Sequence, residues 1–308
     1  MCSSVAGYEF PARQVTWLTR DVLLFAASIG VRADDLHFLY ENHPNFCAFP
    51  TYPLMLPFKH ADQEVVEFYA RNAMNNPPVG PRLDWRYVVD GQRELTILEP
   101  FSTTSTGRQF ELRNKIIGLY DKGKPGTAYA TEQLIVDKES GKAYTKIVTT
   151  YFLPGQGGWG GPRGPFAPSF ESPARKPDAE YTVQTADETV YLHRLNGDYN
   201  PLHSSPEADE KIGTAYYGVL RTCCGSDGSR LRNLQARFAS PVRTGDRLIT
   251  EIWKLGRVGD VGEIRFITRT SSGRPVLPNG RALLLPTEKE ARLQFCTTAK
   301  PTSVLKFI

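Results

Sequence analysis

The sequence predicts an α+β protein built from two similar halves that are joined by a linker. Both halves contain short segments rich in β-branched and aromatic residues, separated by turn residues, which is the pattern of antiparallel strands. The chain has 308 residues, about the length of two ordinary domains. Residues 154–178 are dense in Gly and Pro. We therefore expect domains at residues 1–153 and 179–308, with 154–178 crossing the surface between them.

The first half is expected to begin with a helix and to continue as an antiparallel meander. Thr16 is the expected cap of the helix and Gly30 its stop, and the apolar residues between them cover more than one helical face. Such a helix is normally surrounded by other structure. Residues 46–58 are interrupted by prolines and are expected to cover one end of the sheet irregularly. The expected strands are residues 95–98, 110–120, 128–136 and 142–153.

The second half is expected to be a further sheet with one short helix after its first strand. Ser205 can cap a helix over residues 205–210, with Pro206 in its first turn and acidic residues near its positive end. Residues 225–229 are poor helix material because they combine Gly, Ser and Asp. The expected strands are residues 180–183, 235–242, 247–255, 263–270 and 282–286.

The stretch whose side chains are best suited to acid/base chemistry contains Asp198, Asn200 and His203. Gly197 and Pro201 favour a bend, so that the carboxylate and the imidazole can point at one small volume. Near neutral pH an ordinary Asp is ionised and an ordinary His is close to its titration point, so the pair can take and return a proton. The alternative is an Asx-turn that leads into a helix, with His203 an ordinary surface residue.

Two sequence runs resemble a known family. The run YLHRLNGDYNPLH, followed by LQARFASPVRTGDRLITEIWKLG, resembles the MaoC-like hydratases and dehydratases, and above all the eukaryotic two-domain type 2 enoyl-CoA hydratases. The resemblance implies a double hot-dog fold, in which two antiparallel sheets each wrap a central helix. It also implies that Asp198, Asn200 and His203 form the catalytic motif. The first half, by the same resemblance, lacks the motif and shapes the acyl-chain channel.

One segment departs from the family pattern. The family has a His-Gly-Leu segment whose glycine amide binds the thioester oxygen; Gly218 stands in the corresponding place here, but Tyr217 replaces the histidine. The stretch between Gly218 and Phe238 is also shorter than the family pattern. A shortened central helix is compatible with a wider pocket for a bulkier acyl group and with a damaged, inactive site.

The resemblance implies reversible hydration of a trans-2-enoyl-CoA to the 3R-hydroxyacyl-CoA, in fatty-acid or specialised, polyketide-type metabolism. The expected partner is an acyl-CoA thioester, and no metal, redox group or other cofactor is expected. A hot-dog thioesterase and a catalytically inactive binding or scaffold protein stay open as alternatives. A monomer is possible because two fused hot dogs can pair within one chain, and a homodimer is the other option.

Composition and targeting features limit the other classes. The net charge of +4 is mild and no Lys/Arg run occurs, so no nucleic-acid partner is expected. The five cysteines have no metal spacing, which favours a reduced intracellular compartment. No apolar stretch approaches the roughly 20 residues of a membrane span, and no signal peptide is expected. The end Lys306-Phe307-Ile308 is unlike a Ser-Lys-Leu address, so cytoplasm and peroxisome stay open.

The other patterns in the sequence are expected not to carry function. Gly155, Gly157 and Gly160 match the dinucleotide fingerprint, but the prolines that follow forbid the helix that this fingerprint needs. The remaining candidates are expected to have surface or core roles rather than to bind a metal or a phosphate or to act in redox chemistry. They are His37, His43, His60, His193, Cys223, Cys224 and Arg237.

Overall fold

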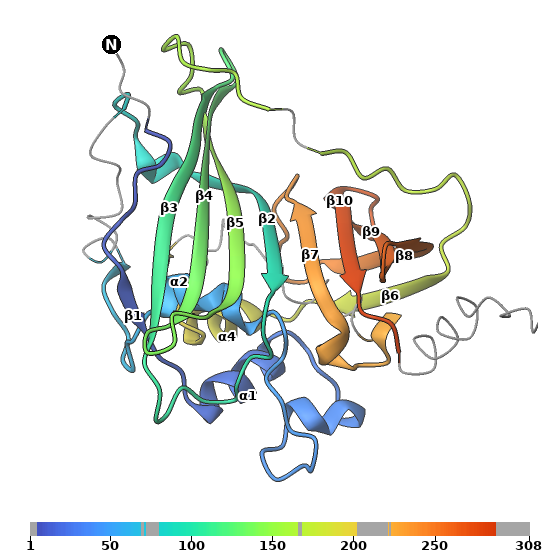
Figure 1. The fold of residues 1–308 in the computed structure, drawn as a ribbon. Helices are drawn as coiled ribbons and strands as arrows, with labels where there is room; N and C mark the ends of the chain where they lie inside the picture. The colour runs from blue at the N-terminus through green and yellow to red at the C-terminus, as the bar shows by residue number, and fades with distance from the viewer. Residues whose placement is uncertain are drawn as a thin grey trace, which may run out of the picture.

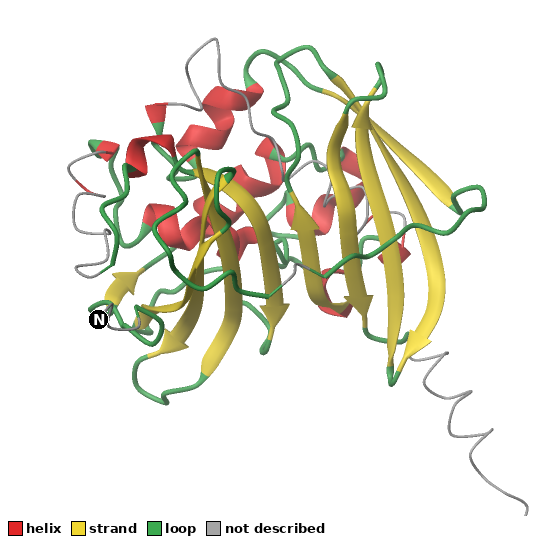
Figure 2. Ribbon diagram, turned by 90° about the horizontal axis from the view of Figure 1, so that it is seen from above, coloured by secondary structure: helices red, strands yellow, loops and turns green. Residues whose placement is uncertain are grey.

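The described residues form a ten-stranded antiparallel sheet in the order β1-β3-β4-β5-β2-β7-β10-β9-β8-β6. A computed structural model describes residues 5–68, 71, 80–165, 168–201, 221 and 223–287. The helices α1, α2 and α4 gather on one face of the sheet (Figures 1 and 2). The strands are β1 Arg13–Val15, β2 Val89–Ile97, β3 Phe110–Asp121, β4 Gly126–Asp137, β5 Ala143–Pro154, β6 Ala179–Gln184, β7 Leu231–Arg237, β8 Arg247–Val258, β9 Val261–Thr270 and β10 Pro275–Leu284.

The two halves of the chain share one sheet because β2 pairs with β7. Gln92 to Thr96 of the first half lie opposite Arg237 to Asn233 of the second half. Leu95 and Leu234, which face each other in this register, are both buried. The α+β architecture with two antiparallel halves is as predicted, and the two predicted sheets are continuous at this junction.

The position of β2 differs from the predicted meander. β3, β4 and β5 do form a meander, but β2 pairs with β5 on one side and β7 on the other, far from β3. β2 is also longer than predicted and begins at Val89. Its start was not predicted because Gly91, Gln92 and Arg93 interrupt the alternation of apolar residues that marks a strand. The loop from β2 to β3 crosses the sheet end, where Ser105 Oγ accepts the Trp17 N–H at 2.9 Å.

Helix α1 spans Thr19–Ser28; its buried apolar residues Val22, Phe25 and Ala26 share one face, so the helix is less completely surrounded than its sequence predicted. The predicted cap was wrong. Thr16 lies before the helix and donates its hydroxyl to the Ala61 carbonyl, whereas the Asp21 carboxylate accepts the Leu18 N–H at 2.8 Å. Gly30, with φ of +82°, follows the helix end as predicted.

The proline-rich segment after α1 is more regular than predicted. Its residues form the short helices η2 Tyr52–Met55 and α2 Leu56–Lys59, and a further short helix, η1 Ala33–Phe38, precedes it. Pro53 and Pro57 stand in the first turns of η2 and α2, where a missing backbone N–H costs nothing. Tyr52 and Leu56 are completely buried, so the segment belongs to the core.

The second half begins with β6, and helix α4 Thr189–Leu195 follows it. Strands β7 and β10 begin before their predicted starts. The residues Arg221, Cys223 and Cys224 are helical, and the chain then leaves the helix at Gly225 (φ +58°) and Ser226 (φ +61°), as the composition of 225–229 predicted. A 3-10 turn, η6 Gly228–Arg230, leads into β7. The predicted helix at 205–210 lies outside the described residues.

The described helices include none that is both long and apolar enough to cross a membrane. Cys224 is buried in the core and Cys223 packs against it, as predicted, and both are free thiols. Burial raises the pKa of Cys223 to about 11 and that of Cys224 to about 12. These thiols are therefore packing groups.

The glycines of the linker surround a carboxylate of the first half. The Asp121 carboxylate accepts the N–H groups of Gly123 at 2.8 Å, Gly158 at 2.7 Å and Gly160 at 2.8 Å. These hydrogen bonds, that from Gly158 first, lower the pKa of Asp121 to about 2. The described residues 161–165 and 168–178 contain no helix. The N–H groups of Gly158 and Gly160 in the glycine-rich run thus bind a carboxylate of their own chain.

Replacing Asp121 with Asn is expected to lower the melting temperature, because an amide has one acceptor oxygen and adds donors where three N–H groups already point. The folded pKa lies below the unfolded one, so the charged Asp121 stabilises fully above about pH 4 and loses this effect as the pH falls through about 2. Melting curves of parent and Asp121→Asn should therefore differ most at neutral pH and converge near pH 2. The exposed Asp187→Asn is the control, and a difference that is equal at both pH values would contradict the prediction.

Candidate active site

The loop that carries Asp198 begins at the end of α4 and is fastened to the helix of the first half. Asn196 donates its side-chain N–H groups to Ser28 Oγ in α1 and to the Leu192 carbonyl in α4, both at 2.9 Å. Gly197 N–H bonds to the Arg194 carbonyl at 2.9 Å and closes the last turn. Asn196 is 4% exposed, so these bonds lie inside the protein. The loop therefore starts from a fixed point between the two halves.

Gly197 lies against the backbone of Lys59 in α2. A Cβ on Gly197 would lie 2.5 Å from Lys59 Cβ and 2.8 Å from Lys59 Cα, closer than such atoms ever approach. The φ of Gly197 is +111°, a conformation that disfavours any other residue. Glycine is required here both by space and by backbone conformation.

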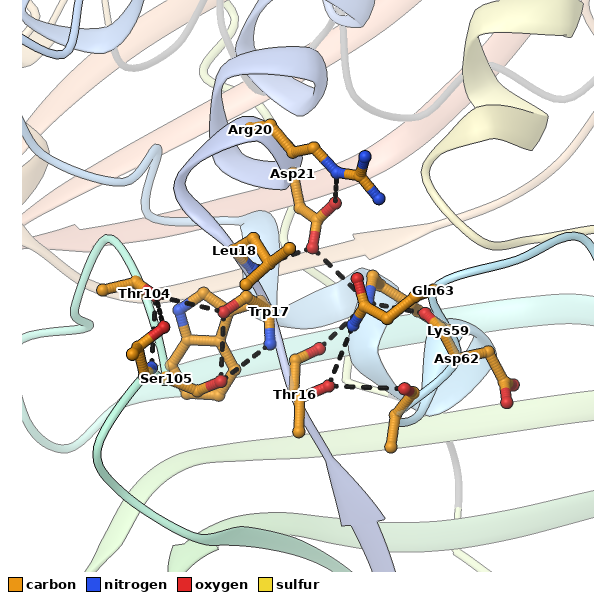
Figure 3. A network of polar contacts seen from close by, with 12 residues as sticks. Thr16, Trp17, Leu18, Arg20, Asp21, Lys59, Asp62, Gln63, Thr104 and Ser105 are labelled. Carbon is orange, nitrogen blue, oxygen red and sulfur yellow. Dashed lines mark hydrogen bonds and ion pairs between the residues drawn. The ribbon is translucent and has the colours of Figure 1, made fainter.

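Lys59 holds this contact through a buried polar network (Figure 3). Its ammonium group donates to the Thr16 carbonyl at 3.0 Å and to the Asp62 carbonyl at 2.9 Å, and lies 3.4 Å from Asp21 Oδ2. Lys59 is 7% exposed, and burial lowers its pKa while the nearby Asp21 opposes that shift. A buried cation with three oxygen partners fixes α2 in place under the loop.

Asp198 is buried and its two carboxylate oxygens face different partners. Oδ1 accepts the Asn200 N–H at 3.2 Å, and Oδ2 lies 3.6 Å from His193 Nε2 in α4. The bond to Asn200 is the Asx-turn that the sequence offered as the alternative explanation of this stretch. The turn uses one lone pair of one oxygen, and a carboxylate has about four acceptor positions. The Asx-turn therefore leaves Asp198 able to act in chemistry.

Tyr151 of β5, in the first half, interacts electrostatically with Asp198. The pKa of Tyr151 is raised to about 12, first by burial, then by the charge of Asp90, and also by the charge of Asp198. Asp90 itself accepts a hydrogen bond from Arg93 at 2.6 Å, and the Arg93 guanidinium lies over the Phe58 ring at 4.9 Å. Charged groups of both halves thus act on the same region.

Two of the predicted site residues, His203 and Gly218, lie outside the described residues, as does Tyr217, so their roles stay predictions. Asp198 and Asn200 lie in one turn. Arg237 is exposed on β7, as predicted.

Comparisons with known proteins cover nearly the whole chain. A family model described as MFE-2 hydratase 2 N-terminal domain matches residues 16–155. A probable dehydratase of Ajellomyces capsulatus is 43% identical over 92% of this chain and 82% of its own length. The chain belongs to the MaoC-like family of type 2 enoyl-CoA hydratases and dehydratases.

A further relative agrees with this assignment in sequence, and two solved structures agree in fold. A probable enoyl-CoA hydratase 2 of Dictyostelium discoideum is 33% identical over 88% of this chain and 92% of its own length. The crystal structure of a MaoC-like dehydratase from Phytophthora capsici superposes with a TM-score of 0.78 at 27% identity, covering 91% of this chain and 97% of that one. A Mycobacterium tuberculosis protein described as a double hot-dog fold matches at 14% identity over 92% of this chain and 98% of that one, with a TM-score of 0.56. The double hot-dog prediction is confirmed.

Sequence reasoning overlooked residues that surround the motif in this MaoC-like protein. His193 was assigned a surface or core role, yet its imidazole faces Asp198. Lys59 and Asn196 drew no attention, although both fix the loop. A histidine in the last helical turn before the motif was the one signal available for His193. Lys59 comes from a distant segment and had none.

Replacing Gly197 with Ala is expected to displace the loop, because a Cβ would overlap Lys59. The free energy of unfolding should fall by more than the roughly 1–3 kcal/mol that a strained backbone alone costs. Denaturant unfolding measures this change.

The matched control for this change is Gly245→Ala. Gly245 also has a positive φ, +84°, but a Cβ there would meet no atom within 4 Å. The free energy of unfolding of Gly245→Ala should fall by no more than the roughly 1–3 kcal/mol that a strained backbone costs. Equal losses for the two variants would contradict the steric role of Lys59.

Proposed function

We propose that the protein is a hydro-lyase that adds water to a trans-2-enoyl-CoA to give the 3R-hydroxyacyl-CoA, and runs the reverse dehydration. The observation that carries the proposal is Asp198, buried in a loop held by both halves and followed by Asn200 in the family motif. The printed names of relatives that cover most of the chain support it, since they are a probable dehydratase and a probable enoyl-CoA hydratase 2.

The reaction needs two groups that exchange protons. The water oxygen bonds to C3 of the enoyl group, one water proton passes to a base, and a proton adds to C2. The C2–C3 double bond becomes a single bond, and the reaction involves no net oxidation or reduction. Asp198 and His203 are the proposed pair, because a carboxylate and an imidazole can take and give these protons near neutral pH. Asn200 is proposed to hold the water or the pair in position.

The thioester oxygen gains negative charge when water adds at C3. A backbone N–H aimed at that oxygen stabilises the charge, and loss of one such donor typically costs about 10²- to 10³-fold in rate. Gly218 is the residue proposed to supply this N–H. Tyr217, in place of the family histidine, is proposed to alter the acyl groups that the site accepts.

The remaining parts of the proposal concern partner, assembly and place. The substrate is proposed to be an acyl-CoA, the chain to act as a monomer or homodimer, and the compartment to be cytoplasmic or peroxisomal. Two relatives named as peroxisomal support the last option; they are the Neurospora crassa hydratase-dehydrogenase-epimerase, of which this chain covers 28%, and the Arabidopsis thaliana enoyl-CoA hydratase 2. The hot-dog thioesterase alternative is supported only by fold, at 10% identity to a putative oleoyl thioesterase of Lactobacillus plantarum.

The test follows the ultraviolet absorbance of the conjugated enoyl thioester, which hydration removes. The parent should remove it without releasing free thiol, and Asp198→Asn and His203→Ala should each lower kcat by about 10²- to 10⁴-fold. A panel of short, long, branched and polyketide-type enoyl-CoA thioesters identifies the acyl group. Thiol release from the parent would indicate hydrolysis and contradict the proposal.

The control variants change the same residue types away from the loop. Asp187→Asn removes an exposed carboxylate shortly before α4, and His43→Phe removes an imidazole between η1 and η2. Both should retain the parent rate. Asp198→Asn and His203→Ala variants as active as these controls would show that the proposed pair does not act.

A further inference from the structure

The imidazole of His193 is an unassigned group next to the proposed acid/base carboxylate. His193 Nε2 lies 3.6 Å from Asp198 Oδ2, with 30% of the His193 side chain and 5% of the Asp198 side chain exposed. At this distance the two groups are an ion pair when the imidazole is protonated, and slightly too far apart for a good hydrogen bond. Such contacts often tighten when substrate binds.

The two oxygens of Asp198 are held from two sides. Oδ1 accepts the Asn200 N–H at 3.2 Å, and Oδ2 faces His193. The end torsion of an Asp side chain is broad and is not fixed by rotamer preference. Partners on both oxygens therefore decide the plane of the carboxylate, and with it which lone pairs face the reaction.

His193 is itself well anchored for this task. It lies in the last turn of α4, and its carbonyl accepts the Asn196 N–H at 3.1 Å. Asn196 is in turn bonded to Ser28 in α1 at 2.9 Å. The imidazole thus projects from backbone that both halves of the protein hold.

We propose that His193 is a positioning residue, which fixes the carboxylate plane of Asp198 relative to the water and the α-proton of the substrate. This inference rests on the proposed hydratase function. His193 acts through Asp198 and touches neither substrate nor water. Its loss should lower kcat with little change in KM, because the substrate contacts are unchanged.

The experiment compares two replacements of similar size. His193→Gln keeps an N–H donor near Asp198, whereas His193→Leu has none. With the enoyl-CoA of the absorbance assay, His193→Leu should lower kcat about 10- to 100-fold, the range expected for a misplaced catalytic group, while KM changes by less than about 2-fold. His193→Gln should recover most of the lost rate.

A double-mutant cycle separates positioning from a general structural effect. If His193 acts through Asp198, then His193→Leu should cause little further loss in the Asp198→Asn background. The same fold loss in both backgrounds overturns the proposal, as does a His193→Gln variant no better than His193→Leu, or a His193→Leu variant with the parent's kcat.

Two checks keep the outcome decisive. Far-ultraviolet circular dichroism and melting temperature report whether each variant folds, and His193→Phe, which keeps a ring without a donor, replaces His193→Leu if that variant does not fold. A parent with no activity on any enoyl-CoA would refute the proposed function. An active parent with an inactive Asp198→Asn and unchanged His193 variants would refute only the positioning role.

Discussion

The close approach of Gly197 to Lys59 is the contact on which the arrangement of the site depends. It brings the loop of the second half directly onto α2 of the first, and only a residue without a side chain permits it. Lys59 is fixed in turn by the carbonyls of Thr16 and Asp62 and by the Asp21 carboxylate. The geometry at Asp198 is therefore determined by both halves, although the motif is in one.

Two buried charges of the described residues are surrounded by polar groups of the same chain. Asp121 is surrounded by glycine N–H groups of the linker, and Lys59 by oxygens around α1 and α2. Satisfied charges of this kind rigidify the structure, because removing either partner leaves the other buried and unpaired. Asp198 belongs to the same pattern, with a backbone N–H on one oxygen and an imidazole facing the other.

The sequence predicted most of the fold because strand periodicity is local. β3, β4 and β5 appear where their β-branched and aromatic residues placed them. β2 and β10 were only partly predicted, since Gly91 and Gly280 break the alternation that marks a strand. The place of β2 in the sheet was not predicted, because the local sequence of a strand does not indicate which distant strand it pairs with.

The motif residues were singled out for a different reason, namely that their types and spacing carry chemistry, and their catalytic roles stay predictions. Asp198 and Asn200 share one turn in the structure. The residues that hold them were not predictable: Lys59 comes from a distant segment, and the role of His193 depends on how α4 ends. Thr16 was a reasonable cap by residue type, but β1 and its bond to Ala61 fix it elsewhere.

The pairing of β2 with β7 has a consequence for how the chain can be divided. Either half made alone would present a full-length strand with unpaired N–H and C=O groups and buried side chains such as Leu95 or Leu234 brought into water. Exposed edges of this kind recruit other chains and lead to aggregation. Because the two halves are fused in one polypeptide, the β2 and β7 edges are always close to each other. Each edge can therefore pair with the other as soon as the second half has been synthesised.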